Sequence, residues 1–128
     1  MNEFAALTVF AGLPVRDLET AVEWYAQLFG RVPDGRPDPQ IAEYYLAHDR
    51  VPEHGTLQLR LDSKRAGGGL ATLNVPDIAA VATVLGALGA KFATRRFPIE
   101  AESVSAVTVG TFLDRDGNAV TVVQPHPR

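Results

Sequence analysis

The sequence predicts an α+β protein built from two copies of one small unit. Three observations support this prediction. Segments with the alternating apolar pattern of a strand are interspersed with segments of helical period. A short motif of Val, Asp and an apolar residue occurs twice, and its two copies lie sixty residues apart. The expected order of elements is therefore β-α-β-β-β, followed by the same order again.

The repeat is clearest where each expected helix begins and ends. The segment 15–18 reads Val-Arg-Asp-Leu, and the segment 75–78 reads Val-Pro-Asp-Ile. Ten residues after the last position of each motif come Leu28 and Leu88, each followed closely by a glycine. Several features aligned in the same order at one offset indicate an internal duplication rather than a chance match.

One helix is expected after each motif aspartate. The side chains of Asp17 and Asp77 can accept hydrogen bonds from the free N–H groups of a first helical turn, where a negative charge is also favoured. Gly30 and Gly89 can adopt the left-handed conformation that ends a helix. Apolar residues recur between these limits at helical spacing, namely Leu18, Ala21, Val22, Tyr25, Leu28 and Phe29 in the first helix and Ile78, Val81, Leu85 and Leu88 in the second.

The remaining apolar segments are expected to be strands. They cover residues 8–13, 43–46 and 56–61 in the first unit and 70–75, 92–97, 107–113 and 119–123 in the second. The segment 31–40 contains three prolines and is expected to be a loop, while 114–118 is expected to be a turn. Gly67–Gly69 is interpreted as a flexible seam. We therefore expect a single domain over 1–128, with modules at about 5–62 and 69–124.

Composition excludes several classes of function. The net charge is −3, so a surface for nucleic acid, which needs a basic excess, is not expected. The chain has no cysteine, which excludes disulfides and thiolate chemistry. The segment 1–4 lacks the basic start of a signal peptide, and the longest nearly apolar run, 78–90, is too short to span a bilayer. We expect a cytoplasmic protein that does not associate with membranes.

Three motifs together resemble a known family. They are Val-x-Asp-Leu at 15–18, Trp24-Tyr25 within the first helix, and Leu-Asp-Arg-Asp-Gly-Asn at 113–118. This combination resembles the vicinal oxygen chelate superfamily, which includes glyoxalase I, ring-cleaving dioxygenases, and fosfomycin and bleomycin resistance proteins. The family's last hairpin usually reads Asp-Pro-Asp-Gly-Asn, and Arg115 stands here in place of Pro. The resemblance implies two βαβββ modules that form a curved mixed sheet around a cleft, with the helices outside.

The resemblance also implies where a catalytic metal would be held. In catalytic members, His or Gln on the first strand and Glu on the last strand of each module are the ligands. Those positions correspond here to Phe10, Gln58, Leu70 and Thr121. One neutral amide cannot hold a divalent ion by itself, so we expect no metal and no other cofactor. The histidines are interpreted as exposed loop residues: His48, His54 and His126.

Strand alternation predicts the lining of the cleft. Leu57, Leu59 and Leu61 should face the helices, which turns Gln58 and Arg60 into the cleft. Arg60 then either pairs with an acid of the protein, reaches the rim, or binds an anionic group of a ligand. Between two neighbouring tyrosines we place the second in the cleft. The expected ligand-binding residues are Phe10, Tyr45, Gln58, Arg60, Leu70, Thr72 and Thr121, and no catalytic residue is identified.

These features favour a metal-free protein that binds or sequesters a small aromatic or amphipathic molecule, in the manner of the bleomycin resistance proteins. The resemblance implies a homodimer, since members of the superfamily often complete the cleft across a two-fold axis. The alternative is a lyase or isomerase, similar to glyoxalases or dioxygenases, with an atypical site. A third possibility is an interaction module whose cleft is vestigial.

Overall fold

The computed structural model describes residues 4–128. Residues 1–3, which begin the expected domain and the N-terminal segment considered above, lie outside the described part. The first module comprises β1 (Phe10–Val15), α1 (Leu18–Phe29), β2 (Gly35–Asp38), β3 (Ile41–Tyr45), a 3₁₀ turn (Pro52–His54) and β4 (Thr56–Leu61). The second comprises β5 (Leu70–Asn74), α2 (Ile78–Ala87), β6 (Thr94–Pro98), β7 (Val104–Leu113) and β8 (Ala119–Pro127).

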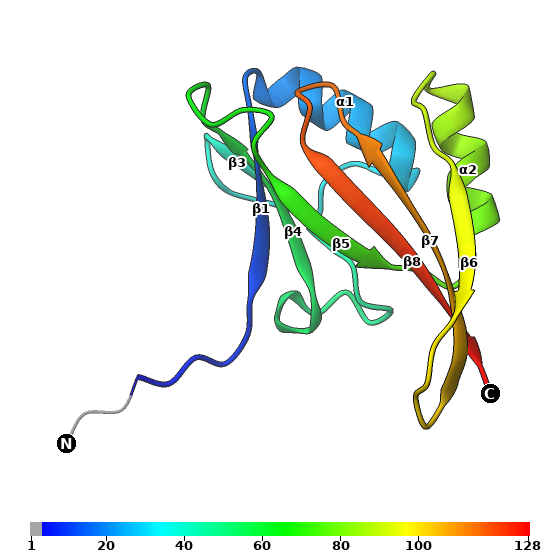
Figure 1. Cartoon of the computed structure of the whole chain (residues 1–128). Helices are drawn as coiled ribbons and strands as arrows, with labels where there is room; N and C mark the ends of the chain where they lie inside the picture. The colour runs from blue at the N-terminus through cyan, green and yellow to red at the C-terminus, as the bar shows by residue number, and fades with distance from the viewer. Residues whose placement is uncertain (1–3) are drawn as a thin grey trace.

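Each module forms its own four-stranded mixed sheet. The strand orders are β1-β4-β3-β2 and β5-β8-β7-β6, with β1 parallel to β4, β5 parallel to β8, and the other pairs antiparallel. The α+β fold class and the doubled βαβββ order are thus confirmed. The two sheets meet where edge strand β1 contacts edge strand β5 (Figure 1), and over the described residues they do not join into one closed sheet.

The helix boundaries follow the expected capping residues. The Asp17 carboxylate accepts a hydrogen bond of 2.9 Å from the N–H of Thr20, and Gly30 ends α1 with a φ of 71°. Asp77 caps α2 in the same way, and Gly89, just beyond that helix, has a φ of 75°. The hydrogen bond from Thr20 is the main reason that the pKa of Asp17 is lowered. Within the described residues, no helix has the length and apolarity needed to cross a membrane.

An aromatic cluster joins the two modules on the helix side of the sheets. The rings of Trp24 and Tyr25 on α1 lie 5.0 Å apart, and Trp24 also packs 5.8 Å from Phe112 on β7. Phe29 lies 4.7 Å from Tyr44 on β3. Edge-to-face and tilted ring pairs of this kind add stabilisation beyond the area that they bury. Trp24 is only 8% exposed, which confirms its interpretation as a core residue.

The hairpin 114–118 attaches the second module to the first. Its Asp114 is buried and accepts a hydrogen bond of 2.8 Å from the Tyr25 hydroxyl of α1. Asn118 donates 2.8 Å to the carbonyl of Pro14 in β1 and also to Asp114. Burial, followed by the nearby Asp114 charge, raises the pKa of Tyr25, so its hydroxyl keeps the proton that it donates. The structural interpretation of this hairpin is therefore confirmed.

Two segments differ from the sequence-based expectation. The expected loop 31–40 contains β2, an edge strand paired with β3. Pro37 is compatible with this strand because an edge strand leaves one side of its backbone unpaired. The expected flexible seam is instead closely packed. A Cβ on Gly69 would lie 2.8 Å from both Asn118 Oδ1 and Pro14 Cδ, and the Gly69 N–H donates to Asn118.

The last strand also extends further than expected. β8 continues to Pro127 because β7 begins at Val104 and pairs with it along this added length. His126 therefore lies within a strand, half-buried, with its Nε2 2.7 Å from the hydroxyl of Thr108. Its assignment to an exposed loop was wrong, since the tail is held by a strand partner that the sequence pattern did not show.

Candidate functional site

Side chains of the first sheet alternate between the helices and the opposite side. Leu13, Leu57 and Leu59 are buried in the core that α1 completes. Leu61, expected in the same row, is 38% exposed because it is the last residue of β4, at the rim of the sheet. We call the side of each sheet that faces away from the helices its open face. It is here that the sequence placed the candidate site.

Four of the predicted residues share the open face of the first sheet. Thr56 on β4 is paired with Phe10 on β1 and with Tyr45 on β3, so these three form one row across the sheet. Gln58 and Arg60 follow Thr56 at alternate positions and lie on the same face. The structure therefore brings Phe10, Tyr45, Gln58 and Arg60 onto a single surface.

The next row of this face is polar and is bordered by glycines. Its order across β1, β4, β3 and β2 is Gly12, Gln58, Glu43 and Gly35. Gln58 Nε2 donates a hydrogen bond of 2.6 Å to Glu43 Oε2, and Gln58 Oε1 accepts one of 3.1 Å from Arg60 Nη1. A carboxylate can only accept and a guanidinium can only donate, so the amide has a single satisfactory orientation between them.

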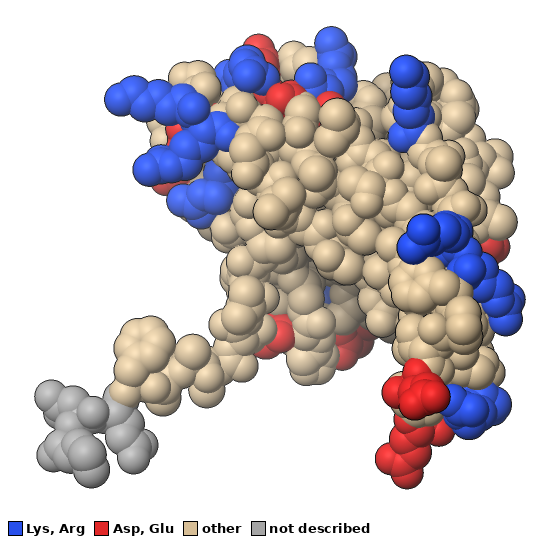
Figure 2. All heavy atoms as spheres, viewed as in Figure 1, with Lys and Arg blue, Asp and Glu red and all other residues tan. Residues whose placement is uncertain are grey.

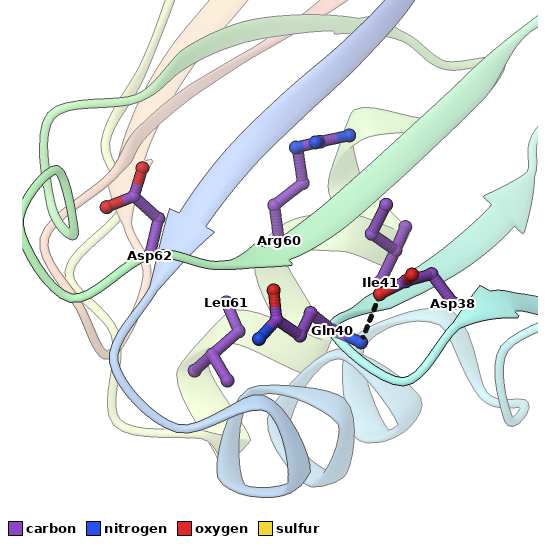
Figure 3. A pocket seen from close by; sticks show the side chains of 6 residues that line it. All are labelled: Asp38, Gln40, Ile41, Arg60, Leu61 and Asp62. Atoms are coloured by element: carbon purple, nitrogen blue, oxygen red, sulfur yellow. Dashed lines mark hydrogen bonds between the residues drawn. The ribbon is translucent and has the colours of Figure 1, made fainter.

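Arg60 rises from β4 on the side opposite to Leu61 (Figure 3). A Cβ on Gly12 would lie 3.0 Å from Arg60 Cδ, so the bare backbone of β1 leaves room for the arginine stem. Over residues 4–128, no carboxylate lies within ion-pair distance of its guanidinium. Arg60 thus interacts with an amide rather than an acid. It borders a pocket of about 240 Å³ lined by Asp38, Gln40, Ile41, Arg60, Leu61 and Asp62.

The open face of the second sheet carries the other three predicted residues. Thr72, Thr121 and Thr111 form a row across β5, β8 and β7, with 2.9 Å between the hydroxyl oxygens of Thr121 and Thr111. Leu70 and Leu113 are 80% and 60% exposed beside this row. Figure 2 shows a broad uncharged surface over these strands, with charged side chains gathered towards its edges. This face offers hydroxyls and apolar surface but no charge.

A second and larger pocket lies between the modules. It has a volume of about 440 Å³, and Thr72 is the predicted site residue that borders it. His54 lines it as well, with Nδ1 2.8 Å from Asp49 Oδ2. Hydrogen bonds from the Val51 N–H and from His54 lower the pKa of Asp49. The remaining lining is Phe29, Arg31, Leu46, Ala47, Leu73, Asn74, Val75 and Pro76.

The positions at which the superfamily holds its metal do not fit a cation in this chain. Phe10 and Leu70 have hydrocarbon side chains with no donor atom. Gln58 is already bonded through both ends of its amide, and one of its partners is the positive guanidinium of Arg60. The Thr121 hydroxyl bonds to another hydroxyl. Within the described part of the chain, no three His, Cys, Asp or Glu side chains gather to form an alternative site.

The sequence analysis missed one residue of this face, Glu43. It is only 7% exposed, although a glutamate is rarely buried without a charged partner. The signal was present, because Glu43 is two positions before Tyr45 and alternation puts both on the same face of a strand. The expected strand began at Glu43 itself, so this residue was not considered as part of the cleft. The open face therefore contains a carboxylate that the sequence-based reading lacked.

Paired βαβββ modules, with helices on one side and an open face on the other, define the class of this protein. The sequence matches the Glyoxalase/Bleomycin resistance protein/Dioxygenase superfamily over residues 6–122. The chain belongs to this superfamily, which is the vicinal oxygen chelate family inferred from the motifs. A comparison with curated proteins finds no match.

Solved structures with the same fold include proteins of that superfamily. A glyoxalase/bleomycin resistance protein from Catenulispora acidiphila DSM 44928 is 28% identical, with a TM-score of 0.71, and the match covers 93% of this chain and 98% of that one. TnmS3, an antibiotic binding protein from Streptomyces sp. CB03234, is 20% identical with a TM-score of 0.63, covering 97% and 99%. At that identity the second likeness establishes the fold alone.

Proposed function

We propose that this protein binds a small aromatic or amphipathic molecule on its open faces without using a metal ion. One observation carries the proposal. The residues at the family's metal positions are apolar, hydroxyl-bearing or already hydrogen-bonded, while the face around them keeps an aromatic row and a polar row. Apolar walls with a few polar groups are the usual composition of a small-molecule site. The two modules, about 5–62 and 69–124, work in this proposal as one domain.

A homodimer in the cytoplasm is part of the same proposal. The predicted binding residues are divided between two sheets that do not close on each other within one chain. Leu70 and Leu113 expose large apolar side chains on one open face. A second copy that places its first sheet over this face would cover the leucines and complete a two-sided site. The absence of cysteine is consistent with a reducing compartment.

The binding experiment uses a panel of aromatic metabolites and antibiotics, screened by thermal shift and followed by isothermal titration calorimetry. We expect saturable, stoichiometric binding of at least one compound in metal-free buffer. Leu70→Asp places a charge on the open face and should weaken both binding and dimer formation. Val32→Asp is the matched control, because Val32 is also exposed, at 73%, and is not a residue of the proposed site. Absence of saturable binding across the panel would refute the proposal.

A second candidate, a lyase or isomerase with an atypical site, is favoured by one observation. Glu43 supplies the carboxylate that a proton-transferring enzyme would need on the open face. Mass spectrometry of the panel after incubation with the protein separates the two candidates. Chemically altered compounds, or stoichiometric Zn, Ni, Mn or Fe after growth with these metals, would favour the enzyme over the binding protein.

A further inference from the structure

Glu43 is an incompletely satisfied carboxylate at the centre of the polar row. Its side chain is nearly buried, and Oε2 accepts the hydrogen bond from Gln58. Among residues 4–128, Oε1 has no hydrogen-bond partner and no basic side chain lies within ion-pair distance of the carboxylate. Burying a charge is costly unless it is paired, so a group of this kind calls for an explanation.

The free oxygen faces a gap that the sequence leaves open. Gly35 is paired with Glu43 on the neighbouring strand and has no side chain. Glu43 Oε1 lies 3.8 Å from the point where a Cβ of Gly35 would be, and the Tyr45 hydroxyl overlaps that same point. A carboxylate oxygen and a phenol therefore border one small space above a bare backbone. This arrangement can accept a hydrogen-bond donor that the protein itself does not provide.

Charge decides which donor fits this space best. The carboxylate is negative, and the nearest cation in its row, Arg60, is separated from it by the Gln58 amide. A protonated amine placed at Oε1 would neutralise the buried charge, and it would also lie near the face or edge of the Tyr45 ring. A neutral hydroxyl would satisfy the hydrogen bond but leave the charge uncompensated.

We propose that Glu43 recognises a cationic amine on the ligand, with the aromatic body of the ligand lying on the row formed by Phe10 and Tyr45. This inference rests on the proposed binding function and narrows its ligand class to aromatic amines that are protonated at neutral pH. Arg60 lies at the other end of the polar row, about 8 Å from Glu43 along and across the strands. A ligand that also carries a carboxylate or carbonyl at that distance would engage both ends.

The test uses two probes that differ in one group, phenethylamine and 2-phenylethanol. Titrations are followed by NMR through the side-chain amide resonance of Gln58, which reports directly on its bond to Glu43. We expect the amine to bind about tenfold or more tightly than the alcohol, as a charge-assisted hydrogen bond implies. Equal affinities of the two probes, or no binding of the amine, would overturn the inference.

Variants of the protein localise the effect. Glu43→Gln keeps the size of the side chain and an acceptor for Gln58 but removes the charge. It should weaken phenethylamine binding about tenfold and leave 2-phenylethanol unchanged. Glu23→Gln is the matched control, since Glu23 is exposed on α1 and lies away from the open face. Unchanged amine binding in Glu43→Gln contradicts the inference, and the comparison of the two probes on the unmodified protein does not depend on how the variant folds.

The two proposals can fail separately. If compounds of the wider panel bind but show no preference for a protonated amine, the role assigned to Glu43 is wrong and the binding function stands. If neither the panel nor the amine binds, both proposals are wrong.

Discussion

The two modules share a backbone plan and differ in the chemistry of their open faces. In the first, the central row is Gly12, Gln58, Glu43 and Gly35, which combines a carboxylate, an amide and bare backbone. The equivalent row of the second module consists of three threonines. The repeat of sixty residues preserves strands and helix caps, which depend on local sequence. Side chains on an open face are not constrained by the core, and here they have diverged.

The helix sides differ as well. α1 buries five residues and carries most of the aromatic cluster, whereas α2 buries only Ile78 and Leu85. Tyr25 and Leu85 are equivalent in the repeat and both are almost completely buried. Tyr25 alone adds a hydrogen bond to the other module, through Asp114. We conclude that the first module contributes more to cohesion, and that the hairpin 114–118 transmits this to the second.

The strongest test of that conclusion is Asp114→Ala. It removes the acceptor for the Tyr25 hydroxyl, for Asn118 and for two backbone N–H groups in the hairpin. We expect the free energy of unfolding to fall by about 4 kcal/mol, because several buried donors lose their partner together. Urea unfolding measures it. Asp62→Ala, which breaks an exposed pair with Arg65, should cost less than about 0.5 kcal/mol, and equal losses would contradict the assignment.

A somewhat smaller effect is expected from Leu85→Ala, which tests the thinner core of the second module. Leu85 is fully buried, so its truncation should lower the free energy of unfolding by about 3 kcal/mol. Leu88→Ala, one turn later at a half-buried position, should cost less than half of that. If the two variants were equally stable in thermal unfolding, α2 would not be anchored through Leu85.

Adding a methyl group to either glycine of the polar row sharpens the comparison of the open faces. Gly35→Ala would overlap the Tyr45 hydroxyl and should cost about 1 kcal/mol, because the ring must move. Gly12→Ala meets only the flexible stem of Arg60 and should change the free energy of unfolding by less than about 0.5 kcal/mol. The shift of the Tyr45 ring resonances in NMR distinguishes the variants, and an unmoved ring in Gly35→Ala would exclude the close contact.

The smallest expected effect concerns the cap of α1. The hydrogen bond from Thr20 lowers the pKa of Asp17 in the folded protein. The carboxylate therefore contributes stability above its unfolded pKa, and this contribution is lost as pH falls through the folded pKa. Asp17→Asn should show a smaller loss of stability between pH 7 and pH 3 than the unmodified protein. Chemical unfolding at both pH values tests this, and identical losses would show that the charge of the cap is not used.

Much of the fold could be predicted because its signals are local. Asp17 and Asp77 begin helices through hydrogen bonds to residues within the same turn, and the glycine at position 30 ends one through its own backbone conformation. The alternation of Leu57 and Leu59 with Gln58 predicted which side of β4 is buried. Each of these signals is contained in a few consecutive residues.

The features that were missed depend on partners distant in sequence. β2 contains a proline and two charged residues, and it is a strand only because β3 offers it an edge. The seam at Gly69 is rigid because Asn118 and Pro14 close on it. Glu43 belongs to the candidate site because the register of β3 against β4 sets it beside Gln58. Neither composition nor periodicity of the segments themselves contains these pairings.

By itself, the sequence determined the doubled α+β plan, the helix caps, the family and the loss of metal-ligating side chains, since all of these follow from residue types at fixed local spacing. Only the tertiary structure decided that the two sheets stay separate, that a hairpin joins them through Asp114, and that a buried carboxylate lies beside Gln58. The physical reason is register. The pairing of strands far apart in the chain determines which side chains meet, and a shift of one residue would turn Glu43 away from the open face.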